Sequence, residues 1–552
     1  MLKEGSEPEV KKLAENGEKV GVIKVRLYRP FSVSHFVKLI PATTKVITVL
    51  DRTKECGATH EPLAQDVISA LADSGLMGIK VLGGRYGLSC KEYTHNHVVA
   101  VYENMLEKKP KNHFTVGIVD DVTKTSLPAN KMQLDFSDKA MVECRFYGLG
   151  SDGTVSANKN SIKIISEYAG LYGQGYFVYD SKKSGGLTTS HLRMSKHAIN
   201  APYLTIHPDF VACHNPSYVD KYDMTAVLKK GGKFLLNCGW DIEELSNRLP
   251  GDVKRFIAEN EIELYTIDGI SIAKEIGLNG RINTILQSAF FKITEIIPAD
   301  EAEKFMKDAA FASYGKKGDA VVEMNYKAIE RGMTSFTKVD YPVDEWAKAE
   351  GAIPTPVATG EDKEIVDFIN SILVPVSAQK GDKLPVSVFS GREDGTFPAG
   401  SAAYEKRGIA VDVPEWIPEN CIGCNKCSLV CPHAAIRPFL LNEAEEAAKP
   451  EGFVTKKAIG KGFEGLTFRV QVDPLDCQGC SSCANACIAK NKALVMEPLE
   501  SQMSEQPIWD YLVELPDKAN PMNKFSVKGS QYERPLYEFS GACAGCGETP
   551  YV

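Results

Sequence analysis

Long apolar runs are missing from this sequence. Its 552 residues contain no uninterrupted apolar stretch of about 18 or more, the length that crosses a bilayer as a helix. The polar residues up to Glu18 hold no hydrophobic segment like that of a signal peptide. Positive charge is not in excess, because 64 Lys and Arg face 72 Asp and Glu for a net charge of −8, whereas nucleic-acid binding favours a basic surface. We therefore expect a cytoplasmic protein with no membrane span and no nucleic-acid partner.

Internal repeats and low-complexity tracts are also absent, apart from two similar groups of cysteines. Hydrophobic residues make up 43% of the sequence and charged residues 25%, which is typical of globular proteins. A chain of this length exceeds one compact domain, so roughly three to five domains are expected.

Strand-like and helix-like segments alternate through the first 345 residues. In the first part, strands are expected at residues 20–27, 46–51, 78–83 and 113–120, and residues 62–76 have helical spacing. In the second part, strands are expected at 140–147, 175–180, 203–207, 210–214, 233–238 and 262–267. This alternation predicts two parallel-sheet α/β domains, residues 1–126 and 133–345.

Prolines interrupt the alternation further along the chain. Five of them occur between residues 346 and 412, at Pro354, Pro356, Pro375, Pro385 and Pro398. Little periodicity accompanies them, so a small irregular domain is expected here. The predicted fold class is α/β multidomain, with a cysteine-rich α+β domain following the irregular one, from residue 413 to residue 500.

Cysteine is unevenly distributed. Five of the 15 cysteines are scattered and are interpreted as small buried apolar side chains: Cys56, Cys90, Cys144, Cys213 and Cys238. The other ten lie between Cys421 and Cys546. In a chain with no export signal, patterned cysteines bind metal more often than they form disulfides. The crowded region is therefore expected to hold metal.

Two runs of cysteine share the spacing C-x2-C-x2-C-x3-C. The first is Cys421, Cys424, Cys427 and Cys431, followed by Pro432, and the second is Cys477, Cys480, Cys483 and Cys487. Bacterial ferredoxins with two 4Fe–4S clusters have this pattern, and the fourth cysteine of each run binds the other cluster. One cluster is therefore expected on Cys421, Cys424, Cys427 and Cys487, and the other on Cys477, Cys480, Cys483 and Cys431. Structural zinc usually takes well-separated C-x2-4-C pairs instead.

Two departures from a simple ferredoxin stand out. Ile488 replaces the proline that usually follows the second run, and 45 residues separate Cys431 from Cys477, which indicates an insertion. A last pair, Cys543 and Cys546, could be a redox pair, half of a zinc site or half of a site for a third cluster, since a 4Fe–4S cluster takes four ligands.

A glycine-rich stretch follows the strand expected at 140–147 and matches G-x-G-x-x-G. It consists of Gly148, Gly150 and Gly153 with Ser151 and Asp152 between them. Such loops bind dinucleotide phosphates, and an acid on the next strand binds the ribose. Asp180 ends the next expected strand, but later than the pattern places it. The alternatives are a turn for close helix–strand packing or a site for another phosphate.

Arg193 lies in a second polar, glycine-rich segment, residues 184–193. Its guanidinium could bind a carboxylate or a phosphate in a bidentate manner, or it could pair with a neighbouring acid. His207 and His214 flank strand-like apolar residues and are interpreted as core or rim histidines rather than metal ligands.

Taken in chain order, these segments resemble the pyruvate:ferredoxin (flavodoxin) oxidoreductases. The resemblance rests on residues 51–58 with 61–63, 84–88, 148–155 with Asn158 and Lys159, 184–193, 403–410, the two cysteine runs and 541–550. Cys56, where the family more often has proline, and His60 depart from the pattern, but neither is near an expected cluster ligand.

The resemblance implies a reaction in which pyruvate and coenzyme A give acetyl-CoA, carbon dioxide and two electrons. Thiamine diphosphate with Mg²⁺ performs the carbon chemistry, and 4Fe–4S clusters pass the electrons to ferredoxin or flavodoxin. It also implies that Cys543 and Cys546 are two of the four ligands of a third cluster. Candidate cofactor-binding residues, with coenzyme A as one ligand, are Gly148, Gly150, Ser151, Asp152, Gly153, Asn158, Lys159 and Arg193.

The family order implies a central portion of the enzyme. Its parts are a transketolase C-terminal-like domain (1–126), a gamma-type domain (133–345), an EKR-type domain (346–412), the two-cluster domain (413–500) and the start of a thiamine diphosphate-binding domain (501–552). No catalytic residue is expected here. The expected assembly is a homo-oligomer or a complex with a partner chain that supplies the thiamine domains. A stand-alone iron–sulfur electron-transfer protein and a nicotinamide-linked iron–sulfur oxidoreductase remain the alternatives.

Overall fold

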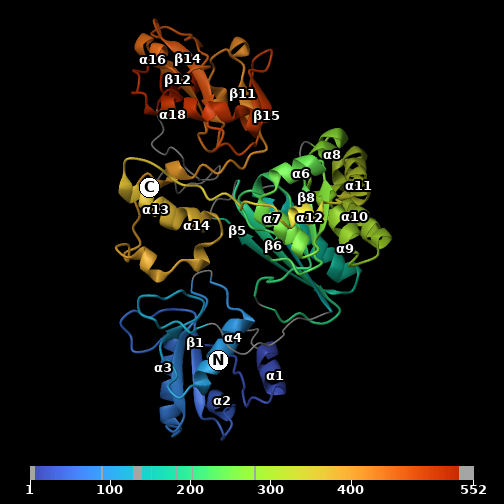
Figure 1. Cartoon of the computed structure of the whole chain (residues 1–552), viewed down its shortest axis with the longest axis vertical. Coiled ribbons are helices and arrows are strands. Elements are labelled where there is room, and N and C mark those ends of the chain that lie inside the picture. The colour runs from blue at the N-terminus through green and yellow to red at the C-terminus, as the bar shows by residue number, and fades with distance from the viewer. Residues whose placement is uncertain are drawn as a thin grey trace.

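The computed structural model describes residues 7–88, 91–128, 140–150, 152–180, 185–201, 203–278 and 281–533 (Figure 1). Ser151, Cys90, Cys543 and Cys546, which the sequence singles out, lie outside these ranges. Figure 1 shows the N-terminal domain at one end of the molecule and the cysteine-rich domain at the other, with the large α/β domain and residues 346–411 between them. The predicted fold class is confirmed.

The N-terminal domain is built on a three-stranded parallel sheet in the order β1-β2-β3. The strands are β1 (Val46–Asp51), β2 (Lys80–Arg85) and β3 (Phe114–Thr115), and the helices are α1 (Glu7–Glu15), α2 (Val33–Lys38), α3 (Pro62–Asp73) and α4 (His95–Leu106). Asp51 ends β1, and its carboxylate accepts hydrogen bonds from the backbone of Leu63 and Ala64 at 3.1 and 3.2 Å. This contact ties the edge of the sheet to the first turn of α3.

Two strand predictions for this domain were wrong. Residues 20–27 form no strand, and the strand expected at 113–120 is only two residues long. Val20 and Val22 pack against the hydrophobic cluster beneath α4, whereas Ile23 packs against the cluster beneath α3. The apolar residues of this segment therefore divide between two clusters along an irregular connection, and their pattern resembles that of a strand.

The central domain contains a seven-stranded sheet in the order β10-β9-β8-β7-β4-β6-β5. Its strands are β4 (Met141–Leu149), β5 (Tyr172–Tyr179), β6 (Leu187–Ser195), β7 (Phe210–Cys213), β8 (Lys233–Asn237), β9 (Glu263–Ile267) and β10 (Thr337–Lys338). Strands β4, β7, β8 and β9 are parallel, as expected, and β5, β6 and β10 pair antiparallel at the two edges. Both faces of the sheet are covered by apolar clusters.

Helices surround this sheet. They are α5 (Thr154–Lys163), α6 (Ile242–Arg248), α7 (Gly251–Glu259), α8 (Gly269–Ile276), α9 (Asn283–Thr294), α10 (Ala299–Tyr314), α11 (Asp319–Thr334) and α12 (Val343–Trp346). Helices α9 and α11 approach closely at Gly332, where an added Cβ atom would lie 2.3 Å from the carbonyl oxygen of Ile285. Glycine is therefore required at this helix crossing.

The strand expected at residues 203–207 was also wrong. The carbonyl oxygens of Tyr203 and Thr205 accept hydrogen bonds from the guanidinium groups of Arg193 and Arg145, respectively. The arginines occupy acceptors that a sheet ladder would use, so the segment crosses the sheet face as a loop.

Residues 346–411 form the irregular region that the prolines indicate. It contains α13 (Lys363–Phe368) and α14 (Val374–Ser377) with several short turns. Ser387 contacts Asp121 of the N-terminal domain, and the Ile409 carbonyl accepts a hydrogen bond from Asn215 of the central domain at 3.0 Å. This region thus connects the α/β domains.

The cysteine-rich domain combines a two-stranded and a three-stranded sheet. Strand β11 (Asp412–Trp416) pairs with β15 (Leu494–Pro498), and the inserted residues form β12 (Ile436–Leu441), β13 (Lys456–Lys457) and β14 (Thr467–Val472) in the order β12-β14-β13. The helices are α15 (Lys426–Leu429), α16 (Glu443–Ala448), α17 (Ser482–Ala486), α18 (Gln506–Glu514) and α19 (Val527–Ser530). Across the described ranges, no helix combines the length and the hydropathy of a membrane span.

Candidate iron–sulfur centres

The two cysteine runs share an unusual backbone conformation. Gly423 and Asn425 of the first run have φ of 65° and 57°, and Gly479 and Ser481 of the second have 68° and 60°. Asn425 and Ser481 immediately precede α15 and α17. Residues with left-handed backbone conformation on both sides of a cysteine turn each loop tightly just before a short helix. The positive φ at Gly423 and Gly479 therefore explains why each C-x-G-C segment has glycine at this position.

The first cavity in this domain is lined by Cys421, Cys424, Cys427 and Cys487. Three of these cysteines come from the first run and one from the end of the second. The rest of the wall is mostly apolar and includes Trp416, Ile422, Val470, Ala489 and Leu494. We refer to it as the first cavity below.

The second cavity shows the reciprocal arrangement. Its wall contains Cys477, Cys480 and Cys483 from the second run and Cys431 from the first, together with apolar residues that include Pro414, Ile436, Val472 and Met496. The structure thus brings together the same two groups of four cysteines that the spacing predicts. That these thiols bind clusters stays a prediction.

The thiols surround a space rather than a single point. Within the described residues, no three His, Cys, Asp or Glu side chains are arranged to hold one metal ion. Burial raises the pKa of Cys427 and of Cys483 to about 12, with smaller contributions from neighbouring cysteines. Soft thiol donors, dispersed around a cavity with a largely apolar wall, fit a cationic iron–sulfur core, which would stabilise their thiolate forms.

The EKR-type segment contacts the second cysteine run through Lys406. Lys406 donates to the carboxylates of Asp473 and Asp476, the latter at 2.7 Å, and Asp476 directly precedes Cys477. A Cβ atom on Gly479 would lie 2.9 Å from the Asp412 carbonyl oxygen. The loop of the second run is therefore packed tightly against backbone.

The loop of the second run also meets the central domain. A Cβ atom on Gly185 would lie 2.5 Å from the Cδ atom of Gln478, and Arg407 forms an ion pair with Asp180 at 3.3 Å. These contacts place the second cavity beside the α/β domain.

Four protein-family models match the chain. They are pyruvate:ferredoxin oxidoreductase core domain II over residues 5–97, pyruvate ferredoxin/flavodoxin oxidoreductase over 143–335, an EKR domain of unknown function over 356–410 and a 4Fe-4S dicluster domain over 420–491. The chain is 54% identical to a pyruvate:ferredoxin oxidoreductase of Moorella thermoacetica, over 99% of this chain and 46% of the relative. It is 50% identical to a pyruvate-flavodoxin oxidoreductase of Enterobacter agglomerans, over 98% of this chain and 45% of the relative.

The chain belongs to the pyruvate:ferredoxin/flavodoxin oxidoreductase family. It spans about half the length of these two family members. A pyruvate dehydrogenase [NADP(+)] of Cryptosporidium parvum is 49% identical over 98% of this chain, which covers 29% of that relative. The dicluster match identifies the cysteine-rich domain of this family member as an iron–sulfur domain.

The glycine-rich loop is occupied by the side chain of its own acid, Asp152. The Asp152 carboxylate accepts hydrogen bonds from the backbone of Leu149 and Thr154 at 2.8 and 2.7 Å. Gly153 precedes α5 with φ of 90°. A negative charge already occupies the helix N-terminus, where a phosphate would bind. The geometry favours the interpretation as a turn.

The other candidates near this loop are also engaged in packing. Strand β5, which precedes Asp180, is an antiparallel edge strand separated from β4 by β6, so the geometry of a dinucleotide-binding βαβ unit is not formed. Asn158 is buried on α5, and the Lys159 ammonium lies over the Phe177 ring at 5.4 Å from its centroid. Arg193 is buried and pairs with Glu143 at 2.7 Å, the alternative that the sequence left open.

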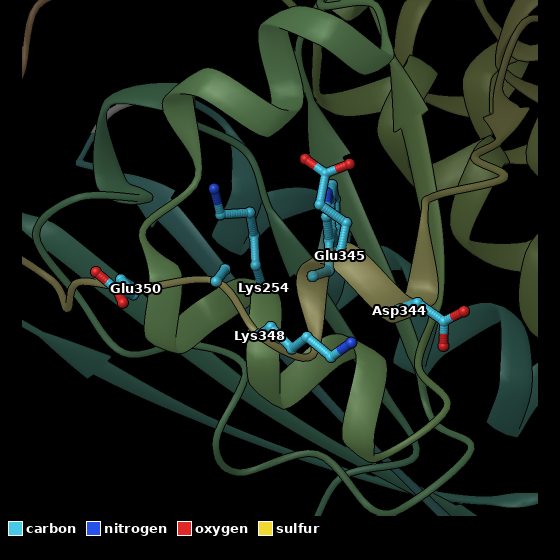
Figure 2. A pocket seen from close by; sticks show the side chains of 7 residues that line it. Lys254, Asp344, Glu345, Lys348 and Glu350 are labelled. Atoms are coloured by element: carbon cyan, nitrogen blue, oxygen red, sulfur yellow. The ribbon is translucent and has the colours of Figure 1, made fainter.

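An open pocket outside the iron–sulfur domain lies on α7 and α12. Figure 2 shows Lys254 and Lys348 there with Asp344, Glu345 and Glu350 around the rim. Its charges are mixed, and Lys254 donates to the carbonyl of Ser246 at 2.7 Å. No sequence motif coincides with it.

Proposed function

We propose that the two cavities bind two 4Fe–4S clusters and that the chain is the electron-transfer portion of a 2-oxoacid oxidoreductase. The observation that carries the proposal is the exchange of the fourth cysteine. Each cavity takes three thiols from one run and one thiol from the other, as in two-cluster ferredoxins. The ligands of the first cluster are Cys421, Cys424, Cys427 and Cys487, and those of the second are Cys477, Cys480, Cys483 and Cys431.

The names of the relatives support pyruvate as the substrate and ferredoxin or flavodoxin as the electron acceptor. The complete enzyme converts pyruvate and coenzyme A to acetyl-CoA and carbon dioxide, with ferredoxin or flavodoxin as the electron acceptor. Thiamine diphosphate and Mg²⁺ supply the carbanion chemistry when bound. The described residues of this chain contribute the ligands and a largely apolar wall around each cavity. Cys543 and Cys546 are proposed as two ligands of a third cluster, and the chain is proposed to act in the cytoplasm with a second copy or a partner chain.

Iron and sulfide content after anaerobic reconstitution tests the proposal. We expect about eight irons per chain for two clusters. Iron near zero with bound zinc would contradict the assignment, and about twelve irons would mean that the third site is complete. The same preparation, given pyruvate, coenzyme A and thiamine diphosphate, is expected not to reduce methyl viologen. Turnover would refute the proposal that the chain is only the electron-transfer portion.

Paired substitutions test the exchange of ligands directly. Cys431→Ala with Cys477→Ala removes two ligands from the second cavity and should leave about four irons in the first. Cys431→Ala with Cys421→Ala removes one ligand from each cavity and should deplete both. If the first double variant loses nearly all iron and the second keeps half, each run binds its own cluster and the exchange is refuted.

A nicotinamide-linked oxidoreductase is the weaker alternative. Asp180 pairs with Arg407, and Asp152 fills the N-terminus of α5. We therefore expect no saturable NADH binding in a fluorescence titration of the reconstituted chain. Tight binding that Gly150→Val abolishes would favour this alternative.

A further inference from the structure

Three lysines bind the backbone around the first cavity. Lys456 Nζ donates to the carbonyl oxygens of Cys421 and Pro418 at 2.6 and 2.7 Å. Lys492 Nζ donates to the carbonyl oxygen of Cys487 at 2.8 Å. Cys421 and Cys487 both line the first cavity. Two ammonium groups are thus fixed to the backbone of two proposed ligands.

The third lysine comes from the last described helix. Lys528 Nζ donates to the carbonyl oxygen of Ile459 at 2.6 Å and lies 4.0 Å from the position of a Cβ atom on Gly423. Gly423 is the glycine between Cys421 and Cys424. Among the residues that the structure describes, Lys456, Lys492 and Lys528 form no ion pair with a carboxylate. Their charges are therefore not compensated locally by a described acid.

The second cavity has a different charge balance. The lysine that contacts its wall, Lys406, is held between two carboxylates, Asp473 and Asp476, and Asp476 itself lines the cavity. One cation between two carboxylates leaves no excess positive charge in this group of three. The two cavities therefore have equivalent sets of thiols, but only the first is accompanied by lysines with no carboxylate partner among the described residues.

We propose that Lys456, Lys492 and Lys528 raise the reduction potential of the first centre above that of the second. The inference rests on the proposed function, because it needs a cluster in each cavity. Reduction adds one negative charge to a cluster, and a nearby fixed cation stabilises the reduced form more than the oxidised one. Lys456 and Lys492 are positioned by the carbonyl groups of two ligands, and Lys528 by the Ile459 carbonyl beside the glycine of the first loop, so their charges stay close to the first centre in both states.

A purely structural role for these lysines predicts a different result. If they only hold the loops, then any substitution that keeps the loops intact leaves the potential unchanged. Charge and hydrogen bonding can be separated, because glutamine keeps a donor but has no charge, whereas arginine keeps both. Lys426 is a matched control, since it is exposed in the first run and, in the described structure, forms no hydrogen bond to a ligand carbonyl.

An EPR-monitored redox titration of the reconstituted full chain tests the proposal. Lys492→Gln and Lys528→Gln should each lower the reduction equilibrium constant of one centre about tenfold, which is about 59 mV for a one-electron couple. Lys492→Arg and Lys528→Arg should restore the potential, and Lys426→Gln should change it by much less. In a Cys477→Ala background, which retains the first centre, the shift should persist.

The outcomes separate the two proposals. A chain that takes up no iron refutes the proposed function. A chain with about eight irons whose potentials do not respond to the glutamine variants refutes this inference alone. Equal shifts in the reduction potentials of both centres would also refute the inference. So would arginine variants whose potentials shift as far as those of the glutamine variants, because neither result follows from a local positive charge.

Discussion

A methyl group on the glycine of each ligand loop should affect the two centres unequally. Gly479 and Gly423 occupy equivalent positions in the two runs and have nearly the same φ, 68° and 65°. A left-handed alanine costs about 1–2 kcal/mol, so this part of the effect is shared. The surroundings of the two glycines differ. A Cβ atom on Gly479 would lie 2.9 Å from the Asp412 carbonyl oxygen and 3.3 Å from the Ala410 Cβ atom. The nearest atom to a Cβ atom on Gly423 would be the Lys528 ammonium nitrogen, at 4.0 Å.

Overpacking against backbone adds about 1–3 kcal/mol for Gly479→Ala alone. That difference corresponds to roughly 5- to 150-fold in the equilibrium that keeps the loop in place, at 1.4 kcal/mol for each tenfold change. We expect Gly479→Ala to lose its iron at a lower concentration of chelator than Gly423→Ala, down to about four irons per chain. The assay is iron retained after a fixed anaerobic incubation with increasing chelator.

A third variant measures the conformational cost away from the clusters. Gly452 lies in the insertion with φ of 78° and open space around it. Gly452→Ala should leave iron retention unchanged. It should lower the free energy of unfolding only by the cost of a left-handed alanine, about 1–2 kcal/mol. Equal iron loss in Gly479→Ala and Gly423→Ala would refute the reasoning, since the close approach to Asp412 would then have no effect.

Three other predictions concern the α/β domains. Gly332→Ala should lower the free energy of unfolding by about 1–3 kcal/mol, because its Cβ atom would force α11 away from α9; thermal unfolding followed by circular dichroism measures this change. Burial lowers the pKa of His191 to about 3 and that of His214 to about 4. The unfolded chain binds these protons below about pH 6.5 and the folded chain does not, so stability should fall from pH 6.5 towards pH 4 by up to about 1.4 kcal/mol per pH unit for each histidine. Urea midpoints at pH 7 and pH 5 measure the slope, and an unchanged slope in His191→Gln would contradict the assignment. Arg248 pairs with Glu500 across domains, but both side chains are partly exposed, so Arg248→Ala should cost less than about 1 kcal/mol in urea unfolding.

Spacing within the chain allowed the grouping of the cysteines to be predicted. The position of Cys431 in the second cavity and of Cys487 in the first follows from local motif geometry, which depends little on the rest of the fold. The central parallel strands were predictable for a similar reason, because each is a buried run of apolar residues between helical segments.

Features that depend on distant partners were not predictable. The antiparallel edge strands of the central sheet depend on pairing that residue pattern alone does not specify. The loop at Thr205 depends on Arg145, which is 60 residues away in the sequence. Lys528 lies more than 100 residues from Gly423 in the loop that it approaches, and nothing in its sequence neighbourhood indicates that contact. Arg193 shows the same limit, since pairing with an acid was one of two open possibilities and the acid itself, Glu143, is 50 residues away in the sequence.

The exchange of ligands between the two runs has a consequence for assembly. Each proposed centre joins residues on both sides of the insertion, so each is a cross-link that closes a loop containing the 45 residues between Cys431 and Cys477. Closing a loop by metal binding reduces the conformational freedom of the unfolded chain, and the binding energy is then also folding energy. The first cluster inserted would bring the cysteines of the second into position, so the pair should form cooperatively. Oxidative loss of either cluster would likewise loosen the other.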